Sequence, residues 1–436
     1  MRSFISLFIF LALSIATFAQ QTKQITLDAI WQSSTFYPEM MRDYRMYPLS
    51  DAYTVVDNNA IILYDLKSDK QIKEVFPASV ASQNKINIDD YAISAHANYV
   101  LIFTDTKQIY RHSTENNVYL YNIKTKMLYH LPGDQNIRLA EISPDEQNIA
   151  IVKNNNLYIY NISTNSEKAI TTDGKRNFII YGTTDWVNEE EFSFIKAFQW
   201  STDGKHLAYY RFDESNVKEF SLNYYNNDVY PEEYKYKYPK AGEDNAIIDL
   251  FIYDIDNGNN TKLNLGEDKD IYIPRIKWLK NENKLAVMRL NRLQNNLDIL
   301  LYSPQDANGN KVYNEQNKTY IEITDNWVMT NDGGWFYTSE KNGFNHIYYF
   351  NPTSNIDKQI TNGSWDVKDI LGVDEKNMNI YYTSYEDGPM NIMCYAVNYQ
   401  NGSKNKILSD LGTHSPVFSA TYKYLIDEYS NINTPP

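Results

Sequence analysis

A short strand-like motif recurs through the chain and constrains its fold more than any other feature. Apolar residues alternate with tyrosines and the motif ends near Asp or Asn, as in residues 61–66, 118–123, 157–162 and 250–255. Such alternation is typical of half-buried β-strands. The tyrosines in equivalent positions are Tyr64, Tyr121, Tyr160, Tyr253, Tyr302, Tyr349 and Tyr395. Their successive steps are 57, 39, 93, 49, 47 and 46 residues. A period near 45 to 50 residues predicts an all-β fold, a β-propeller in which each repeat is one four-stranded blade.

Turn sequences form a second repeat in phase with the first. Residues 143–145, 201–204 and 331–334 combine Ser or Asn with Asp, Pro or Gly, and each is followed by an apolar strand. These residues suit hairpin turns, because Pro presets φ and Gly accepts positive φ. One 93-residue step between tyrosines implies an insertion at residues 181–245. Insertions in repeat folds tend to build the functional face.

The ends of the repeat set the predicted domain boundaries. Residues 20–50 read as a lead-in segment, and residues 51–436 as the propeller. A last unit begins at residues 416–420 and the sequence stops soon after it, at Pro436. We therefore predict seven to eight four-stranded blades, with the last blade incomplete.

The N-terminus has the pattern of an export signal. Arg2 provides the positive charge, residues 4–16 are apolar, and Thr17 and Ala19 are the small residues before a cleavage site. We interpret residues 1–19 as a signal peptide cleaved after Ala19, which predicts a periplasmic or extracellular protein. A buried N-terminal helix is the alternative, but the run has no amphipathic face. No later stretch is apolar enough to cross a membrane.

Charge and cysteine content exclude some classes of protein. The chain has 41 Lys plus Arg against 55 Asp plus Glu, a net charge of −14. A nucleic acid would be repelled by this charge, so we expect no nucleic-acid partner. Cys394 is the only cysteine, so an exported form must be stable without an internal disulfide.

Three adjacent carboxylates stand out at residues 189–191, within the run Asp-Trp-Val-Asn-Glu-Glu-Glu that starts at Asp185. Two of them could project into one cavity at a strand end or on a short helical turn. Their mutual repulsion would then favour a bound cation, such as the ammonium group of a peptide's amino terminus. The alternative is an exposed acidic turn with no ligand.

Three motifs in order give a specific resemblance. They are the run at residues 185–191, Tyr-Arg-Phe-Asp-Glu at residues 210–214, and Tyr-Pro-Lys-Ala-Gly-Glu-Asp-Asn at residues 238–245. With these motifs the chain, from residue 25 to its end, resembles the N-terminal propeller of the dipeptidyl peptidase IV family of serine exopeptidases. The resemblance implies an eight-bladed propeller that caps an α/β-hydrolase domain. It also implies release of N-terminal dipeptides, preferably after Pro or Ala, and a homodimer for the full-length form.

The resemblance also implies roles for individual residues. Glu190 and Glu191 would bind the α-ammonium group of the substrate. We expect Glu189 to be structural and to pair locally. Arg111, which precedes His112 and Ser113, would hold the substrate carbonyl group. For Arg111 the alternative is a charged residue at a strand end without this role.

The sequence departs from the family in its catalytic residues. A serine hydrolase of this type needs a nucleophilic Ser in a Gly-x-Ser-x-Gly turn, followed by Asp and His. No such motif occurs in the 436 residues, so we expect no catalytic residues in this chain and no peptidase activity from it alone. The α/β-hydrolase domain is then a missing partner. The alternative is a stand-alone propeller that binds peptides or proteins without cleaving them.

We predict no metal site and no cofactor. The six histidines have no i, i+4 pair, which makes a zinc site improbable, and no phosphate-binding or dinucleotide loop is present. The recurring tryptophans are expected in the core. They are Trp186, Trp200, Trp278, Trp327, Trp335 and Trp365.

Overall fold

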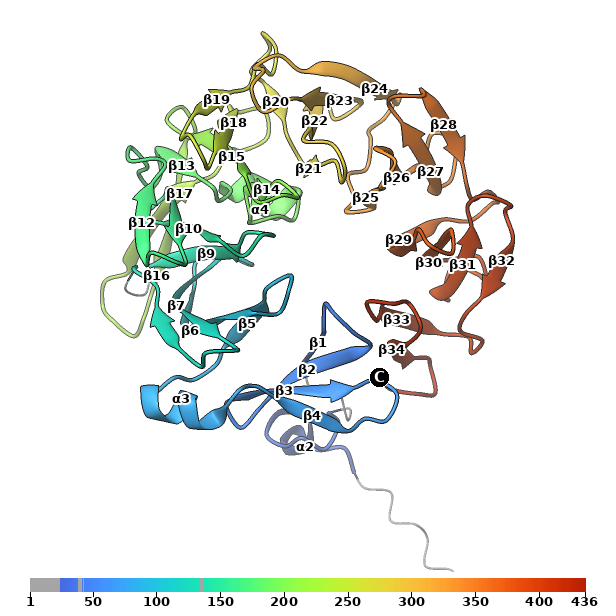
Figure 1. The fold of residues 1–436 in the computed structure, drawn as a ribbon, viewed down its shortest axis with the longest axis horizontal. Helices are drawn as coiled ribbons and strands as arrows, with labels where there is room; N and C mark the ends of the chain where they lie inside the picture. Colours follow the sequence, from blue (N-terminus) through green and yellow to red (C-terminus); the bar gives the residue numbers. More distant parts are fainter. Residues whose placement is uncertain (1–23, 38–40, 42, 134–135) are drawn as a thin grey trace, which may run out of the picture.

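The computed structural model describes residues 24–37, 41, 43–133 and 136–436. The predicted signal peptide, residues 1–19, lies outside the described residues. Antiparallel strands form eight successive units arranged as a ring around a central axis (Figure 1). The last unit contains two strands. This confirms the predicted all-β propeller, in which the last blade was expected to be incomplete.

The first three units each have four strands in sequential order. The first contains β1 (Tyr44–Met46), β2 (Ala52–Asp57), β3 (Ala60–Asp65) and β4 (Gln71–Phe76). The second contains β5 (Asp90–Ile93), β6 (Tyr99–Gln108), β7 (Thr114–Asn122) and β8 (Leu128–His130). The third contains β9 (Ile137–Ile142), β10 (Asn148–Lys153), β11 (Asn156–Asn161) and β12 (Ser166–Ala169).

The fourth and fifth units have a divided inner strand. The fourth contains β13 (Ile179–Tyr181), β14 (Phe198–Trp200), β15 (His206–Asp213), β18 (Ile247–Asp254) and β19 (Asn260–Lys262). The fifth contains β20 (Ile271–Tyr272), β21 (Ile276–Trp278), β22 (Leu285–Asn291), β23 (Asn296–Tyr302) and β24 (Asn310–Gln316).

The last three units follow the fifth around the ring (Figure 1). The sixth contains β25 (Trp327–Met329), β26 (Trp335–Ser339), β27 (His346–Asn351) and β28 (Ile356–Gln359). The seventh contains β29 (Val367–Asp374), β30 (Asn379–Ser384), β31 (Met393–Asn398) and β32 (Lys404–Lys406). The eighth contains β33 (Thr413–Phe418) and β34 (Leu425–Ser430).

All seven tyrosines of the repeat lie in the third strand of the first seven units, from Tyr64 in β3 to Tyr395 in β31. The core lies between neighbouring units, where second and third strands bury apolar side chains. For example, Ile61 from the first unit and Val100 and Tyr121 from the second belong to one buried cluster. Burial of each large apolar side chain stabilises the fold by roughly 1.5–3 kcal/mol.

Neighbouring units are joined in two different ways. The second and third units share a sheet, because Asn116 in β7 pairs with Ile137 in β9. The first and eighth units are joined by side chains, since the hydroxyls of Ser419 and Thr421 donate hydrogen bonds of 2.7 and 2.5 Å to Asp51 Oδ1. The last unit therefore lies beside the first (Figure 1).

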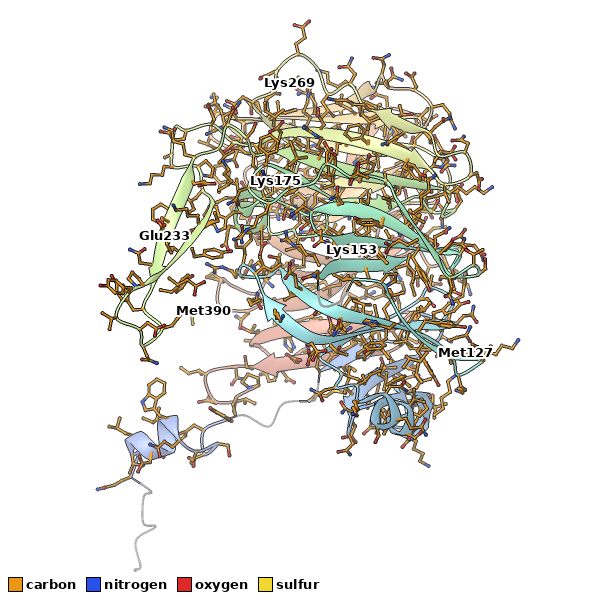
Figure 2. All side chains as sticks on the ribbon, turned by 90° about the vertical axis from the view of Figure 1, so that its left-hand side faces the viewer. Met127, Lys153, Lys175, Glu233, Lys269 and Met390 are labelled. Atoms are coloured by element: carbon orange, nitrogen blue, oxygen red, sulfur yellow. The ribbon has the colours of Figure 1, made fainter. Side chains whose placement is uncertain are left out.

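The predicted insertion is divided between two places and is not an extra blade. Helix α4 (Trp186–Glu191) lies between β13 and β14, and a hairpin of β16 (Glu219–Tyr224) and β17 (Glu232–Lys237) lies between β15 and β18. Figure 2 shows this hairpin, marked by Glu233, standing away from the body of the propeller. Both additions belong to the fourth unit.

Two further helices are short. Helix α2 (Leu27–Trp31) belongs to the predicted lead-in and buries none of its residues, and α3 (Ala78–Asn84) follows β4. The first sheet starts within residues 20–50, because β1 pairs with β2. No helix among the described residues has the length and apolar character needed to span a bilayer.

The tryptophan prediction holds for most positions. Trp200, Trp278, Trp327 and Trp335 are buried in the core clusters. Trp186 and Trp365 are half-buried. Trp365 packs against a core cluster, whereas Trp186 departs from the prediction, because it lies on α4 and lines a cavity. A helix that connects two strands at the ring's interior exposes one side, and Trp186 lies at its first turn.

Candidate functional site

The carboxylate run folds as helix α4, which lies on the side of the fourth unit that faces the ring's centre (Figure 1). Asp185 is the N-cap, and its side chain accepts hydrogen bonds from the backbone N–H of Asn188 at 3.0 Å and from Asn188 Nδ2 at 2.7 Å. Such a cap satisfies a helix N–H group that has no partner within the helix. Burial raises the pKa of Asp185 above its ordinary value. The cap thus fixes the start of α4, and the three glutamates are the last three residues of this helix.

Glu189 points into the protein and holds the segment that carries Arg111. Its side chain is fully buried, and Oε1 accepts hydrogen bonds from the backbone N–H groups of His112 at 2.8 Å and Ser113 at 2.9 Å. The segment lies between β6 and β7 of the second unit. Glu189 therefore connects two units that are distant in sequence. It has a structural role, but the expected local pairing is wrong, because its partners lie in another unit.

Glu190 lies beside Arg111. Arg111 Nε is 3.0 Å from Glu190 Oε2 and 3.3 Å from Glu190 Oε1. The side chain of Glu190 is 17% exposed, whereas that of Arg111 is 70% exposed. The structure thus brings together two of the three residues to which the sequence analysis assigned substrate contacts.

Glu191 ends the helix and is exposed at the edge of a cavity. Within the described part of the chain, its carboxylate makes no hydrogen bond or ion pair. We call Arg111, Glu190 and Glu191 the α4 site. Their arrangement leaves one carboxylate paired and the next one unpaired.

The position of these charges on the helix is unfavourable in the absence of a cation. The C-terminal end of a helix carries a partial negative charge, and an anionic side chain there costs about 0.3–1 kcal/mol. Glu190 and Glu191 occupy this end of α4, and its last turn contains no basic residue. Arg111 offsets part of this negative potential, and a second cation would offset the rest.

The cavity beside Glu191 has a volume of about 810 Å³ and a wall of aromatic side chains, which we call the aromatic cavity. Trp186 of α4 packs against Tyr238 with ring centroids 4.3 Å apart, and Phe220 lies 5.5 Å from Tyr238. The full aromatic set is Trp186, Phe192, Phe220, Tyr236, Tyr238 and Tyr272. Such a surface suits an apolar ring or side chain next to a charged group.

Burial raises the pKa of Tyr236, and the neighbouring tyrosines and Glu190 add to this effect. The phenol therefore stays neutral at physiological pH and serves as a hydrogen-bond donor or acceptor. Tyr236 lies in β17, so the inserted hairpin contributes directly to the wall of the aromatic cavity.

The described residues contain no group of three or more His, Cys, Asp or Glu side chains arranged to hold a metal ion.

The sequence analysis assigned no role to the aromatic wall. Tyr238 begins a motif that carried the family resemblance, Tyr236 lies two residues before it, and this motif was the available signal. Their place opposite Trp186 depends on how the hairpin folds back toward α4, which strand periodicity does not specify.

Comparisons with known proteins give the family of the chain. Residues 94–436 match the family model described as dipeptidyl peptidase IV (DPP IV) N-terminal region. The crystal structure of Porphyromonas gingivalis dipeptidyl peptidase 4 is 35% identical in sequence, with a TM-score of 0.89, over 94% of this chain and 59% of that one.

Curated relatives match along a similar range. Dipeptidyl aminopeptidase B of Saccharomyces cerevisiae is 30% identical over 88% of this chain and 49% of its own length. A probable dipeptidyl-aminopeptidase B of Uncinocarpus reesii is 30% identical over 73% of this chain and 38% of its own length. The chain therefore spans less than half the length of these relatives.

Proposed function

The chain belongs to the dipeptidyl peptidase IV N-terminal region family, and on this premise we propose that it binds the free amino terminus of peptides for an exported serine peptidase. In this proposal Glu190 and Glu191 bind the α-ammonium group, and Arg111 holds a carbonyl group of the bound peptide. The peptidase releases N-terminal dipeptides with Pro or Ala in second position.

One observation carries the proposal: two adjacent carboxylates end α4 beside a cavity, Arg111 pairs with Glu190, and no ion pair to Glu191 occurs among the described residues. A peptide ammonium group would supply the second cation. Hydrogen bonds between charged partners contribute about 1.5–3 kcal/mol each, more than neutral ones.

The aromatic cavity supports the preference for Pro or Ala. Trp186 and Tyr238 present ring faces next to Glu191. A pyrrolidine ring or a methyl group would pack there once the ammonium group is held. A fixed anionic site at one end of the substrate also acts as a ruler, because it sets how many residues reach the scissile bond.

Bond cleavage is assigned to an α/β-hydrolase domain that this sequence does not contain. The 436 residues hold no Gly-x-Ser-x-Gly motif, so the catalytic Ser, Asp and His would come from that domain. We accordingly propose that this chain is inactive as a peptidase by itself. We further propose export through residues 1–19, to the periplasm or the extracellular space, and a homodimer for the full-length form.

Calorimetric titration of the full chain tests the proposal. The ligands are Ala-Pro-Ala and its N-acetylated form, which differ in the ammonium group alone. We expect binding of the free amine that is at least tenfold tighter, about 1.4 kcal/mol. Equal affinity for the two peptides would contradict amine recognition.

Variants locate the recognition. The double variant Glu190→Gln with Glu191→Gln should bind both peptides equally. Glu267→Gln serves as a matched control, because Glu267 is an exposed glutamate in a loop of the fifth unit. Retention of amine preference in the double variant would place the recognition elsewhere.

A further inference from the structure

A second, smaller cavity lies at the other end of α4. Its volume is about 310 Å³, and Asp185, the N-cap of α4, is part of its lining. Tyr234 of the hairpin strand β17 lines it, whereas Tyr236 of the same strand lines the aromatic cavity. Both α4 and β17 therefore contribute to two distinct cavities. We call the smaller one the Arg138 cavity.

Arg138, in β9 of the third unit, brings a charged group with free donors to this cavity. Its Nε and Nη2 atoms are buried and have no hydrogen-bond partner among the residues that the structure describes. These two N–H groups lie on the same edge of the guanidinium plane. They form the parallel pair of donors that matches the two oxygens of a carboxylate.

An unpartnered buried guanidinium needs an explanation, because buried polar groups are almost always hydrogen-bonded. A buried charge without a partner costs several kcal/mol. Burial lowers the pKa of Arg138 from its ordinary value, and nearby groups, including Glu189, Glu115 and Glu214, oppose this effect. None of these groups accepts a hydrogen bond from Nε or Nη2.

The other charges of the cavity favour an anion over a cation. Arg176 adds a second guanidinium to the lining. Burial raises the pKa of Glu214 to about 8, so its carboxyl group is mostly protonated at pH 7. The Asp185 carboxylate already accepts two hydrogen bonds from Asn188. Glu115 is the remaining acid of the lining.

We propose that the Arg138 cavity is a carboxylate-binding site in which Arg138 Nε and Nη2 hold both oxygens of the ligand. The site goes beyond amine recognition, because no residue of the α4 site lines this cavity. A free carboxylate, or an acidic side chain of a peptide bound at α4, has the required chemistry. Because α4 lies beside both cavities, a peptide bound at α4 could supply the carboxylate, and this source is compared below with a free carboxylate.

Two measurements on the full chain separate the sources. The first compares thermal unfolding in sodium acetate and in sodium chloride at equal ionic strength, and acetate should raise the Tm by about 2 °C at 100 mM. The second compares the affinities of Ala-Pro-Glu-amide and Ala-Pro-Gln-amide, and the acidic peptide should bind at least threefold tighter if the peptide supplies the carboxylate.

Three variants test the role of the paired donors Nε and Nη2 of Arg138. Arg138→Lys keeps the charge and removes the paired donors, so it should abolish each effect seen in the wild type. Arg289→Lys is the matched control, because Arg289 already donates to Leu265 O and to Asp298. Asn155→Asp, which places a negative charge in the lining, should also abolish the effect, and it serves if Arg138→Lys fails to fold.

The outcomes are distinct from those of the amine experiment, since acetate has no amino group. An acetate effect or a preference for the acidic peptide that disappears in Arg138→Lys or Asn155→Asp supports the site and identifies its ligand. The proposal is overturned if neither effect occurs in the wild type, or if both variants retain it.

Discussion

Arg111 and Glu190 form an ion pair between the second and fourth units, with Arg111 Nε 3.0 Å from Glu190 Oε2. The two residues are 79 positions apart in sequence. The neighbouring Glu189 supports this pair, because its Oε1 accepts hydrogen bonds from the backbone N–H groups of His112 and Ser113. One glutamate thus positions the arginine segment while the next one meets its side chain.

Arg111→Ala should change binding much more than stability. The Arg111 side chain is 70% exposed, and exposed ion pairs contribute about 0–1 kcal/mol. Urea denaturation should therefore show little change. If Arg111 holds a peptide carbonyl, its loss should weaken Ala-Pro-Ala and the N-acetylated peptide by the same factor, about threefold to tenfold. A loss confined to the free amine would contradict this role.

Glu189→Ala should destabilise the protein by about 2–4 kcal/mol, because it leaves two N–H groups in a buried region without an acceptor. Glu189→Gln keeps one oxygen as acceptor and should cost less. Glu191→Ala, an exposed neighbour, should change the free energy of unfolding by less than about 0.5 kcal/mol. Urea denaturation compares the three, and similar values for Glu189→Ala and Glu191→Ala would refute the bridging role.

Glu214→Gln should stabilise the protein at neutral pH. The folded-state pKa of about 8, raised by burial, lies above the ordinary value of 4.5, so the unfolded chain releases this proton first and wild-type stability falls as pH rises from 4.5 to 8. The gain from the amide should reach about 3 kcal/mol at pH 7 and vanish near pH 4. Chemical denaturation across this range measures it, and a gain that does not depend on pH would argue against the titration of Glu214.

Asp51 should support the fold above about pH 4 and not in strong acid. Hydrogen bonds from Thr421 and Ser419 hold the pKa of Asp51 below its ordinary value, the bond from Thr421 having the largest effect. Its contribution is present above the unfolded pKa and is lost as pH falls through the lowered folded value. The destabilisation caused by Asp51→Asn should therefore shrink in acid, whereas the exposed control Asp228→Asn should show no such trend.

Sequence periodicity was sufficient to predict the propeller, because the spacing from Tyr64 to Tyr395 reflects one position, buried or half-buried, that is repeated in the third strand of each of the first seven units. The same reasoning located the insertion within residues 181–245 but did not resolve how it is divided. The structure places α4 before β15 and the hairpin of β16 and β17 after it. Length alone does not tell how inserted residues are distributed around a strand such as β15.

Within the site, the sequence identified the glutamate run but gave no direct measure of which members face inward. On a helix, three consecutive side chains point in directions about 100° apart, so Glu189 becomes buried while Glu191 is exposed. No sequence pattern predicted that Arg138 Nε and Nη2 would lie buried without a hydrogen-bond partner among the described residues. This arrangement results from a third-unit strand meeting the fourth-unit insertion, and such contacts depend on tertiary structure.

The junction between the first and eighth units differs physically from that between the second and third. Where β7 and β9 pair, separation of the units breaks a backbone contact, but at Asp51 it breaks side-chain bonds to Ser419 and Thr421. Transient local opening should therefore need less free energy at the Asp51 junction. Native-state amide hydrogen exchange should accordingly be faster in β1 and β34 than in β7 and β9. The Asp51 junction would then be the place where the propeller opens locally.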